Sequence, residues 1–206
     1  MPHRSSCRRV EVITVIEDFS RRMLMKLQIQ DLLLTALFAS LTAIGASIHV
    51  PLPFTVIPIT LQTLFVYIAG VLLGSRLGAL SQSLYVLMGI VGLPVFAGWR
   101  SGFEVLIGPT GGYILGFIPG SYVIGKLADL KTRPSFHWLL LCMTAGTLVI
   151  YLLGILQITF VLRIGFREAM VVGVFPFIVG DLVKTIIAAF IVNHIRSMLP
   201  LRWSKG

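Results

Sequence analysis

Long apolar runs, separated by short polar or glycine- and proline-containing segments, dominate the chain. Within these runs the apolar residues are continuous and do not alternate with polar ones, so they predict membrane-spanning helices rather than the strands of a barrel. A helix needs roughly 20 residues to cross a hydrocarbon core of about 30 Å. Six runs approach this length, at residues 29–48, 59–75, 77–92, 112–129, 137–162 and 176–196. We therefore expect an all-α, polytopic membrane protein with six transmembrane helices.

Two of the connections between these runs are long. The segment "HVPLPFTVIPIT" (residues 49–60) cannot form a regular helix, because Pro51, Pro53 and Pro58 lack backbone donors and bias the preceding residues to extended conformations. The other segment, residues 93–112, contains several glycines and one arginine. At membrane depth, irregular backbone must be covered by protein or line a wet cavity. Both connections are predicted to lie on the same side of the membrane.

The composition agrees with a membrane protein and weakens one alternative. The chain of 206 residues is 56% hydrophobic and only 12% charged, with a mean hydropathy of +0.94. Its net charge of +9 could suggest a nucleic-acid partner, but the basic residues lie at the ends of apolar runs and form no basic and aromatic patch. Membrane topology accounts for them better, and we expect the bilayer and not a nucleic acid as the partner.

The distribution of basic residues predicts the orientation. If the N-terminus is cytoplasmic, the cytoplasmic segments carry thirteen Lys and Arg residues and the external segments carry only three, Arg100, Arg163 and Arg167. Cytoplasmic loops are enriched in Lys and Arg. Both termini are therefore predicted to be cytoplasmic, and the segments at 49–60 and 93–112 to be external.

The first residues are polar and basic, and translation could start at Met1, Met23 or Met25. A later start would allow the first apolar run to be interpreted as a secretory signal, but the run is long for a signal and further spans follow. The predicted organisation has three parts, a basic cytoplasmic leader at 1–26, a single six-helix membrane domain at 27–198 and a cytoplasmic tail at 199–206.

Several functional classes lack their usual motifs. The two cysteines and four histidines are dispersed, so no disulfide framework or metal site is predicted. There is no GxxxxGK[ST] loop, which excludes ATP binding of the P-loop type. HExxH and GxSxG are absent, and so is a cluster of intramembrane acids, so an enzyme acting on lipid is disfavoured. We expect no cofactor and no catalytic residues.

The last apolar run carries an acid and an amine, Asp181 and Lys184, in "FPFIVGDLVK". Their i,i+3 spacing places them on one face of a helix. Because a charge at bilayer depth costs about 2.5–3.5 kcal/mol even on lenient scales, both must face the protein interior and find partners. They could form a structural ion pair, or the polar end of a ligand pocket below the external connections. As an acceptor and a donor, they would suit a neutral group with an N–H beside a carbonyl, such as a cyclic urea or amide.

Three further residues are candidates for the same pocket. Arg100 could be an exposed loop residue paired with Glu104, or it could hold a carboxylate at the mouth of the pocket, since guanidinium matches a carboxylate bidentately. Tyr85 and Tyr113 are polar-tipped aromatic residues near the same level, where each could pack or contact a ligand.

Small residues in the first run form an AxxxA step at Ala39 and Ala43. Such steps let another helix approach closely, but they also arise by chance in apolar helices. If the step faces outward, it predicts contact with a partner subunit.

Three stretches together carry a family resemblance: "TLQTLFVYIAGVLLGSRLGALSQSLYVLMGIVGLPVFAG" (60–98), "GPTGGYILGF" (108–117) and "FPFIVGDLVK" (175–184). They closely resemble the BioY family, the biotin-specific substrate-binding (S) components of energy-coupling-factor (ECF) transporters. The resemblance extends over nearly all of residues 28–196. It implies an ECF S-component fold in the bacterial cytoplasmic membrane.

The resemblance also implies a function and partners. The chain would capture biotin and deliver it through a complex with a transmembrane coupling (T) subunit and two ABC-type ATPases, without chemistry of its own. Asp181 and Lys184 would then bind the ureido ring of biotin, and Ala39 and Ala43 would contact the coupling subunit. For the carboxylate tail we expect Arg100. Two alternatives remain open: an S component for a different vitamin, and a solitary biotin carrier that works without partners.

Overall fold

The structure is a computed structural model that describes residues 29–53 and 55–198. By its internal contacts the chain divides into two units, Met1–Leu34 and Thr35–Gly206. The fold and the site described below belong to the second unit. Of the helices and strands, only the start of the first helix lies in the first unit. The predictions for the leader at 1–26 and the tail at 199–206 fall outside the described residues.

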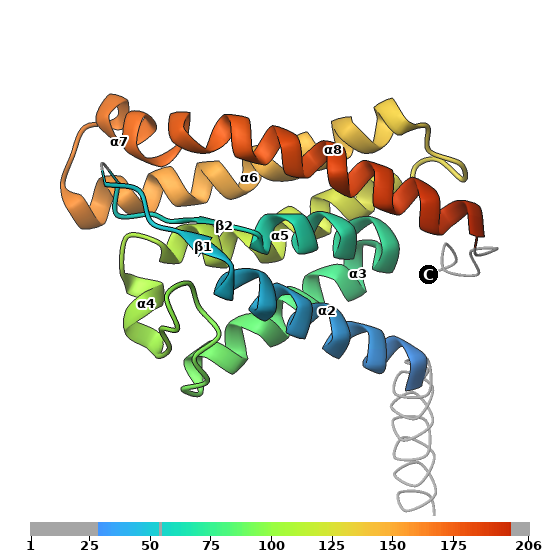
Figure 1. Cartoon of the computed structure of the whole chain (residues 1–206), viewed down its shortest axis with the longest axis horizontal. Helices are drawn as coiled ribbons and strands as arrows, with labels where there is room; N and C mark the ends of the chain where they lie inside the picture. Colours follow the sequence, from blue (N-terminus) through green and yellow to red (C-terminus); the bar gives the residue numbers. More distant parts are fainter. Residues whose placement is uncertain (1–28, 54, 199–206) are drawn as a thin grey trace, which may run out of the picture. The chain divides into compact units, whose positions relative to one another are not determined.

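The described part of the chain is mostly helical, as predicted (Figure 1). Four of its helices, α2, α3, α6 and α8, are long and apolar enough to cross a membrane. Its elements, in chain order, are α2 (Ile29–Ser47), β1 (His49–Val50), β2 (Ile59–Thr60), α3 (Gln62–Ile90), α4 (Phe103–Ile107), α5 (Gly111–Ala128), α6 (Phe136–Leu162), α7 (Phe166–Gly173) and α8 (Phe175–Met198).

The runs at 59–75 and 77–92, expected as separate helices, correspond to the two helical halves of α3, which meet at a kink where Gly74 adopts a φ of 78°. Glycine tolerates this conformation because it has no Cβ. One expectation needs correction: the fold is not purely helical, since β1 and β2 pair antiparallel with His49 opposite Thr60. The prolines between these short strands exclude regular helix, as expected from the sequence.

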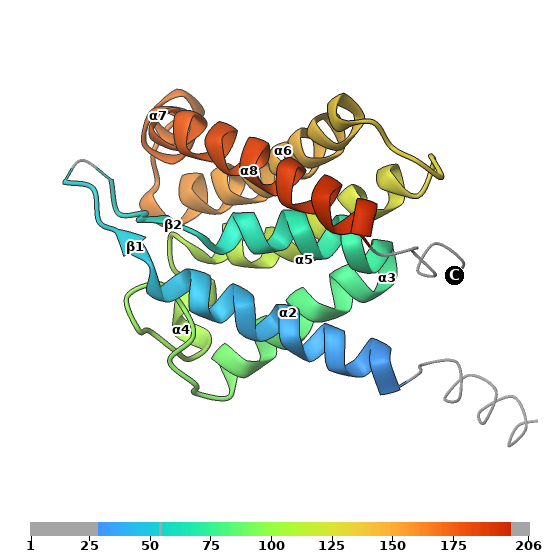
Figure 2. The ribbon, with the colours of Figure 1, turned by 45° about the vertical axis from the view of Figure 1, so that its right-hand side comes forward.

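Helix α5 lies between α3 and α6 and packs closely against α6 (Figures 1 and 2). Gly112, Gly116 and Gly120 follow one another at four-residue spacing on α5 and face the backbone or side chains of Leu153 and Ile150 on α6. A Cβ added at any of these glycines would come within 3.0 Å of α6 atoms. Small residues at such positions let membrane helices approach until their backbones touch.

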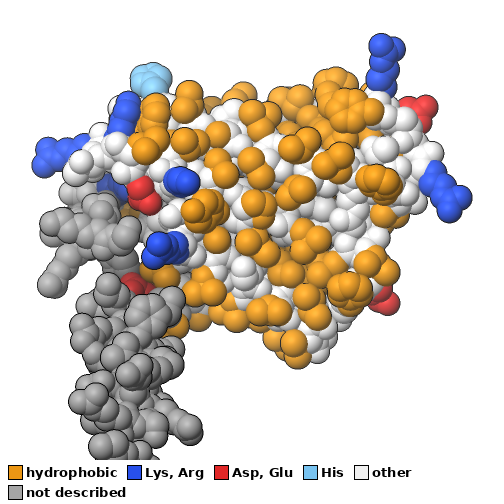
Figure 3. All heavy atoms as spheres, turned by 180° about the vertical axis from the view of Figure 1, so that it is seen from behind, with side chains coloured by type: hydrophobic (Ala, Val, Ile, Leu, Met, Phe, Trp, Pro, Cys, Tyr) orange, Lys and Arg blue, Asp and Glu red, His pale blue; other side chains and the backbone are white. Residues whose placement is uncertain are grey.

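Large apolar side chains also cover the outside of the unit. Figure 3 shows one face on which hydrophobic side chains fill the middle, while Lys, Arg, Asp and Glu gather toward the two ends. Exposed examples are Leu148 and Phe160 on α6 and Leu182 and Phe190 on α8. An apolar surface of this extent is typical of a protein whose solvent is lipid, and it agrees with the candidate spans.

The long connections meet at one end of the helices (Figure 1). Thr55, between β1 and β2, donates a hydrogen bond from its hydroxyl to the carbonyl oxygen of Val172 in α7, at 2.8 Å. Tyr113, in the first turn of α5, donates to the carbonyl oxygen of Gly173 at 2.8 Å. The hairpin and α7 are therefore fastened to each other and to α5 at the end where the cavity described next opens.

Candidate ligand-binding site

A cavity of about 650 Å³, counting its open mouth, lies beneath these connections. Both long connections contribute to its wall, through Ile57 and Pro58 from one and Ala97 and Val105 from the other. Helices α3, α5, α6 and α8 supply the remaining walls.

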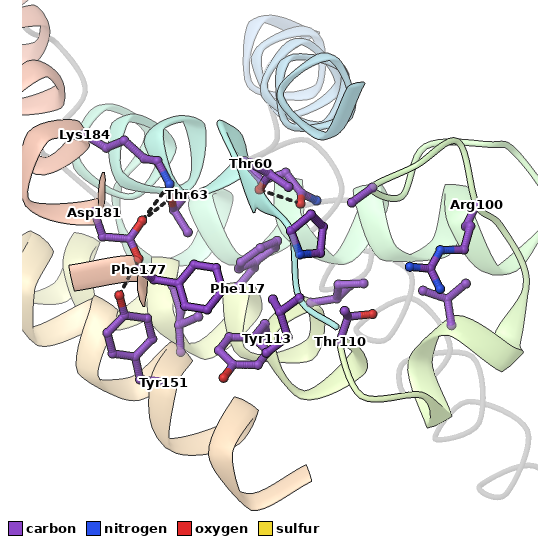
Figure 4. Close-up of a pocket in the computed structure, with 17 residues that line it drawn as sticks. Thr60, Thr63, Arg100, Thr110, Tyr113, Phe117, Tyr151, Phe177, Asp181 and Lys184 are labelled. Carbon is purple, nitrogen blue, oxygen red and sulfur yellow. Dashed lines mark hydrogen bonds and ion pairs between the residues drawn. The ribbon is translucent and has the colours of Figure 1, made fainter. Parts of the chain in front are cut away.

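Asp181 and Lys184 lie together at one end of this cavity (Figure 4). Both are buried, with 6% and 7% of their surface exposed, and the Lys184 ammonium lies 2.7 Å from Asp181 Oδ1. Pro176 lies in the first turn of α8, where its missing N–H leaves no hydrogen bond unmade. The prediction that the acid and the amine share one inward face is confirmed. The pair is an ion pair, and it also faces a cavity.

Two neighbours of this pair were not singled out from the sequence. Thr63 on α3 donates to Asp181 Oδ1 at 3.1 Å and accepts from the Lys184 ammonium at 3.2 Å. Tyr151 on α6 donates from its hydroxyl to Asp181 Oδ2 at 2.5 Å. Both residues also line the cavity. Three helices therefore converge on one carboxylate.

The middle of the cavity is apolar and aromatic. Phe117 on α5 and Phe177 on α8 are buried side chains of its wall, and Figure 4 shows them between the Asp181 end and the Arg100 end, together with Tyr113. Ile114 and Ile150 complete this section. Such a lining would accommodate a hydrophobic body carried between two polar ends.

Arg100 lines the cavity at the end opposite Asp181 (Figure 4). It is exposed and follows a tight turn in which Gly98 and Trp99 have φ values of 75° and 59°. The turn is closed by a bridge between Phe96 and Arg100, whose carbonyl oxygen accepts from the Phe96 N–H at 3.0 Å. Within residues 29–53 and 55–198 no ion pair joins Arg100 to Glu104, so the arrangement leaves the guanidinium available to an anion.

The two predicted tyrosines have different positions. Tyr113 lines the cavity, as expected for a ligand contact. Tyr85 is fully buried and does not line it; its hydroxyl accepts from Gln62 Nε2 and donates to the Val95 carbonyl oxygen at 3.1 Å. Its ring also meets Phe96 edge to face, with the ring centroids 5.7 Å apart. Tyr85 therefore supports the turn that carries Arg100 and holds Gln62, which does line the cavity.

The small-residue step on α2 does not face outward as a whole. Ala39 is completely buried within this chain, whereas Ala43 is half-buried. Contact of a partner with Ala39 would require α2 to move. The small residues that lie open on the neighbouring face are Ala36 and Ser40.

Comparison with known proteins agrees with this geometry. The profile of the BioY family matches residues 20–201. The biotin transporter BioY of Thermotoga maritima is 41% identical over 169 residues, which cover 82% of this chain and 97% of that protein. The probable biotin transporter BioY of Pyrococcus horikoshii is 40% identical over 167 residues, covering 81% and 96% of the two chains.

A solved structure shares the fold. The crystal structure of the S-component for biotin from an ECF-type ABC transporter superposes with a TM-score of 0.77 and 25% sequence identity. The match covers 82% of this chain and 92% of that one.

Proposed function

Because the chain belongs to the BioY family, we propose that it captures biotin as the S component of an ECF transporter, with Asp181, Lys184, Arg100 and Tyr113 in the binding site. The chain is a multi-pass membrane transport protein, not an enzyme. Biotin combines a cyclic urea, an apolar thioether ring and a carboxylate tail. The observation that carries the proposal is the order of groups along the cavity: an ion pair, an aromatic middle and a free guanidinium.

The urea would meet Asp181 and Lys184. A urea N–H can donate to the carboxylate, and the urea oxygen can accept from the ammonium. The ring would then lie against Phe117 and Phe177, and the tail would extend toward Arg100. A guanidinium binds a carboxylate with two parallel hydrogen bonds in the best geometry. Tyr85 supports the tail end without touching the ligand.

In the membrane, we place the mouth of the cavity outside and both termini in the cytoplasm of a bacterial cell. The support is the excess of Lys and Arg in the segments assigned to the cytoplasm. The two halves of α3, separated at Gly74, together with α5, would raise the four long spans to six crossings. The hairpin, α4 and α7 would then cover the external end.

Energy for uptake would come from partners, because the chain contains no P-loop motif. The proposed assembly contains a transmembrane coupling subunit and two ABC-type ATPases, and the chain itself needs no cofactor. Ala36, Ser40 and Ala43 on α2 offer small side chains to a partner helix. Uptake of labelled biotin in cells with and without the coupling subunit tests this point, since uptake that persists without it would indicate a solitary carrier.

Equilibrium binding to the purified, detergent-solubilised protein tests the ligand. We expect labelled biotin to bind and desthiobiotin, which retains the cyclic urea, to compete. Thiamine and riboflavin, which lack a urea beside an apolar ring and a carboxylate tail, should not compete. Competition by one of these vitamins, together with no binding of biotin, would assign the cavity to a different ligand.

A further inference from the structure

The hydrogen bonds around Asp181 limit what its carboxylate can still accept. An ionised carboxylate has about four acceptor positions, two on each oxygen. On Oδ1 both are used, by the Lys184 ammonium at 2.7 Å and the Thr63 hydroxyl at 3.1 Å. On Oδ2 one is used, by the Tyr151 hydroxyl. One acceptor position therefore remains for a ligand.

The Lys184 ammonium is limited in the same way. It has three N–H donors. One donates to Asp181 Oδ1 at 2.7 Å and one to the Thr63 hydroxyl at 3.2 Å. Its remaining donor and the remaining acceptor of Asp181 belong to two buried side chains that line the same cavity. Together they match a ligand edge with one N–H beside one carbonyl oxygen.

We propose that Tyr151 determines the specificity of this end of the cavity by occupying one acceptor position of Asp181. Tyr151 is a positioning residue in this role, since it acts through the carboxylate. The inference rests on the proposed function, because it concerns how the same site distinguishes ureas from related groups. Without the Tyr151 hydroxyl, Asp181 Oδ2 would present two open acceptor positions and the carboxylate would lose one of its three fixed donors.

The analogue 2-iminobiotin makes this difference measurable. At neutral pH this compound is a cyclic guanidinium, in which an NH2 group replaces the carbonyl oxygen of the urea, so it offers no acceptor to Lys184 and brings additional donors. When 2-iminobiotin binds to the wild-type protein, the remaining donor of Lys184 is left unpaired, and Asp181 has only one open acceptor position for the ligand's donors. We expect 2-iminobiotin to bind at least roughly 100-fold more weakly than biotin at neutral pH.

Tyr151→Phe tests the role of the hydroxyl. Without the hydroxyl, the Asp181 carboxylate that binds biotin is held less firmly. The vacated acceptor position on Asp181 can, however, accept a hydrogen bond from an additional donor of 2-iminobiotin. The ratio of the two dissociation constants should therefore narrow roughly 10-fold in Tyr151→Phe. If the substitution only removed packing, it would weaken the binding of both ligands equally. The ratio of their dissociation constants would then stay within about twofold of the wild-type ratio, and this result would overturn the proposal.

Tyr113→Phe is the matched control. Tyr113 lines the same cavity, but its hydroxyl donates to the Gly173 carbonyl oxygen and not to Asp181. Its removal can weaken both ligands, yet the ratio of their dissociation constants should stay at the wild-type value. A ratio that narrows equally in Tyr113→Phe and Tyr151→Phe would contradict a specific role for Tyr151.

A second measurement uses only the wild-type protein. In each of two lactam analogues of biotin, one urea N–H is replaced by CH2, so that each keeps a single N–H beside the carbonyl. If the pair accepts one N–H, one analogue should bind within about 10-fold of biotin and the other roughly 100-fold more weakly. If both analogues lost the same amount of affinity relative to biotin, the inference that Asp181 has one open acceptor position would be overturned. Failure of the wild-type protein to bind biotin at all would instead refute the proposed function.

Discussion

The two ends of the cavity are built in different ways. At one end, Asp181 and Lys184 are buried on α8 and are held by Thr63 from α3 and Tyr151 from α6. At the other end, the exposed Arg100 stands on a tight turn. A charge inside a membrane protein must have fixed partners, whereas a charge near water does not. We infer that the helical end supplies most of the affinity and selectivity, and that the end formed by connections controls capture and release.

The largest expected effect comes from the helical end. The double variant Asp181→Asn, Lys184→Met removes both charges while nearly preserving side-chain volume. Hydrogen bonds to charged groups contribute about 1.5–3 kcal/mol each, so loss of two of them should weaken biotin binding at least roughly 100-fold. Equilibrium binding to the purified protein measures the loss.

The double variant is preferable to either single change. Removing one partner of a buried ion pair leaves the other charge uncompensated, and that alone costs about 3–5 kcal/mol of stability. Thermal unfolding of the double variant, followed in detergent, shows whether it remains folded. A folded double variant that binds biotin as tightly as the wild type would refute the assignment of this end to the urea.

A smaller effect is expected at the other end. Arg100→Gln should weaken the binding of biotin roughly 10-fold, because the ion pair with the carboxylate tail is lost. Biotinamide has no carboxylate, so its affinity should not change. Competition experiments with the two ligands measure the difference.

Arg167→Gln is the matched control for this change, since Arg167 is exposed in α7 and does not line the cavity. It should affect neither ligand. Equal weakening of biotin and biotinamide by Arg100→Gln would show that Arg100 does not bind the tail, and would remove the distinction between a urea end and a tail end.

The same contrast explains what the sequence could predict. Asp181 and Lys184 were evident because charges are rare in apolar runs, and their spacing determines a common face. Thr63 was not, because threonine hydroxyls in helices usually bond to their own backbone, as Thr144 does here. Tyr151 was not, because the sequence does not indicate which of the tyrosines in the apolar runs reaches Asp181. Only the packing of α3 and α6 against α8 brings these two to Asp181.

The helices themselves were predicted more closely than the connections. Apolar runs specified α2, α5, α6 and α8 nearly to their ends, and the break predicted between the runs at 59–75 and 77–92 lies beside the kink at Gly74 that separates the two halves of α3. Ala39 was predicted to contact a partner, but the pattern of small residues does not indicate which side of α2 meets the rest of this chain. The exposed face of a helix depends on tertiary packing and not on the AxxxA spacing alone.

The smallest expected effect concerns the fastening of the hairpin. Thr55 is half-buried, and its hydroxyl joins the segment between β1 and β2 to the Val172 carbonyl oxygen of α7. Ile57 and Pro58, which follow on the same segment, form part of the cavity wall. A ligand in the cavity would therefore have to pass this segment or displace it, and its release should depend on how firmly the segment is held.

Thr55→Val keeps the shape of the side chain but removes this hydrogen bond. A neutral hydrogen bond contributes about 0.5–1.5 kcal/mol, so the dissociation rate of biotin should rise roughly threefold while the association rate changes little. Pre-bound labelled biotin, chased with unlabelled ligand, measures the rate. Thr144→Val removes a hydroxyl that bonds only to the Leu140 carbonyl of its own helix, and it should leave the rate unchanged. If Thr55→Val releases biotin no faster than Thr144→Val, the hairpin does not restrain the ligand, and control of release must be assigned to Arg100 and its turn.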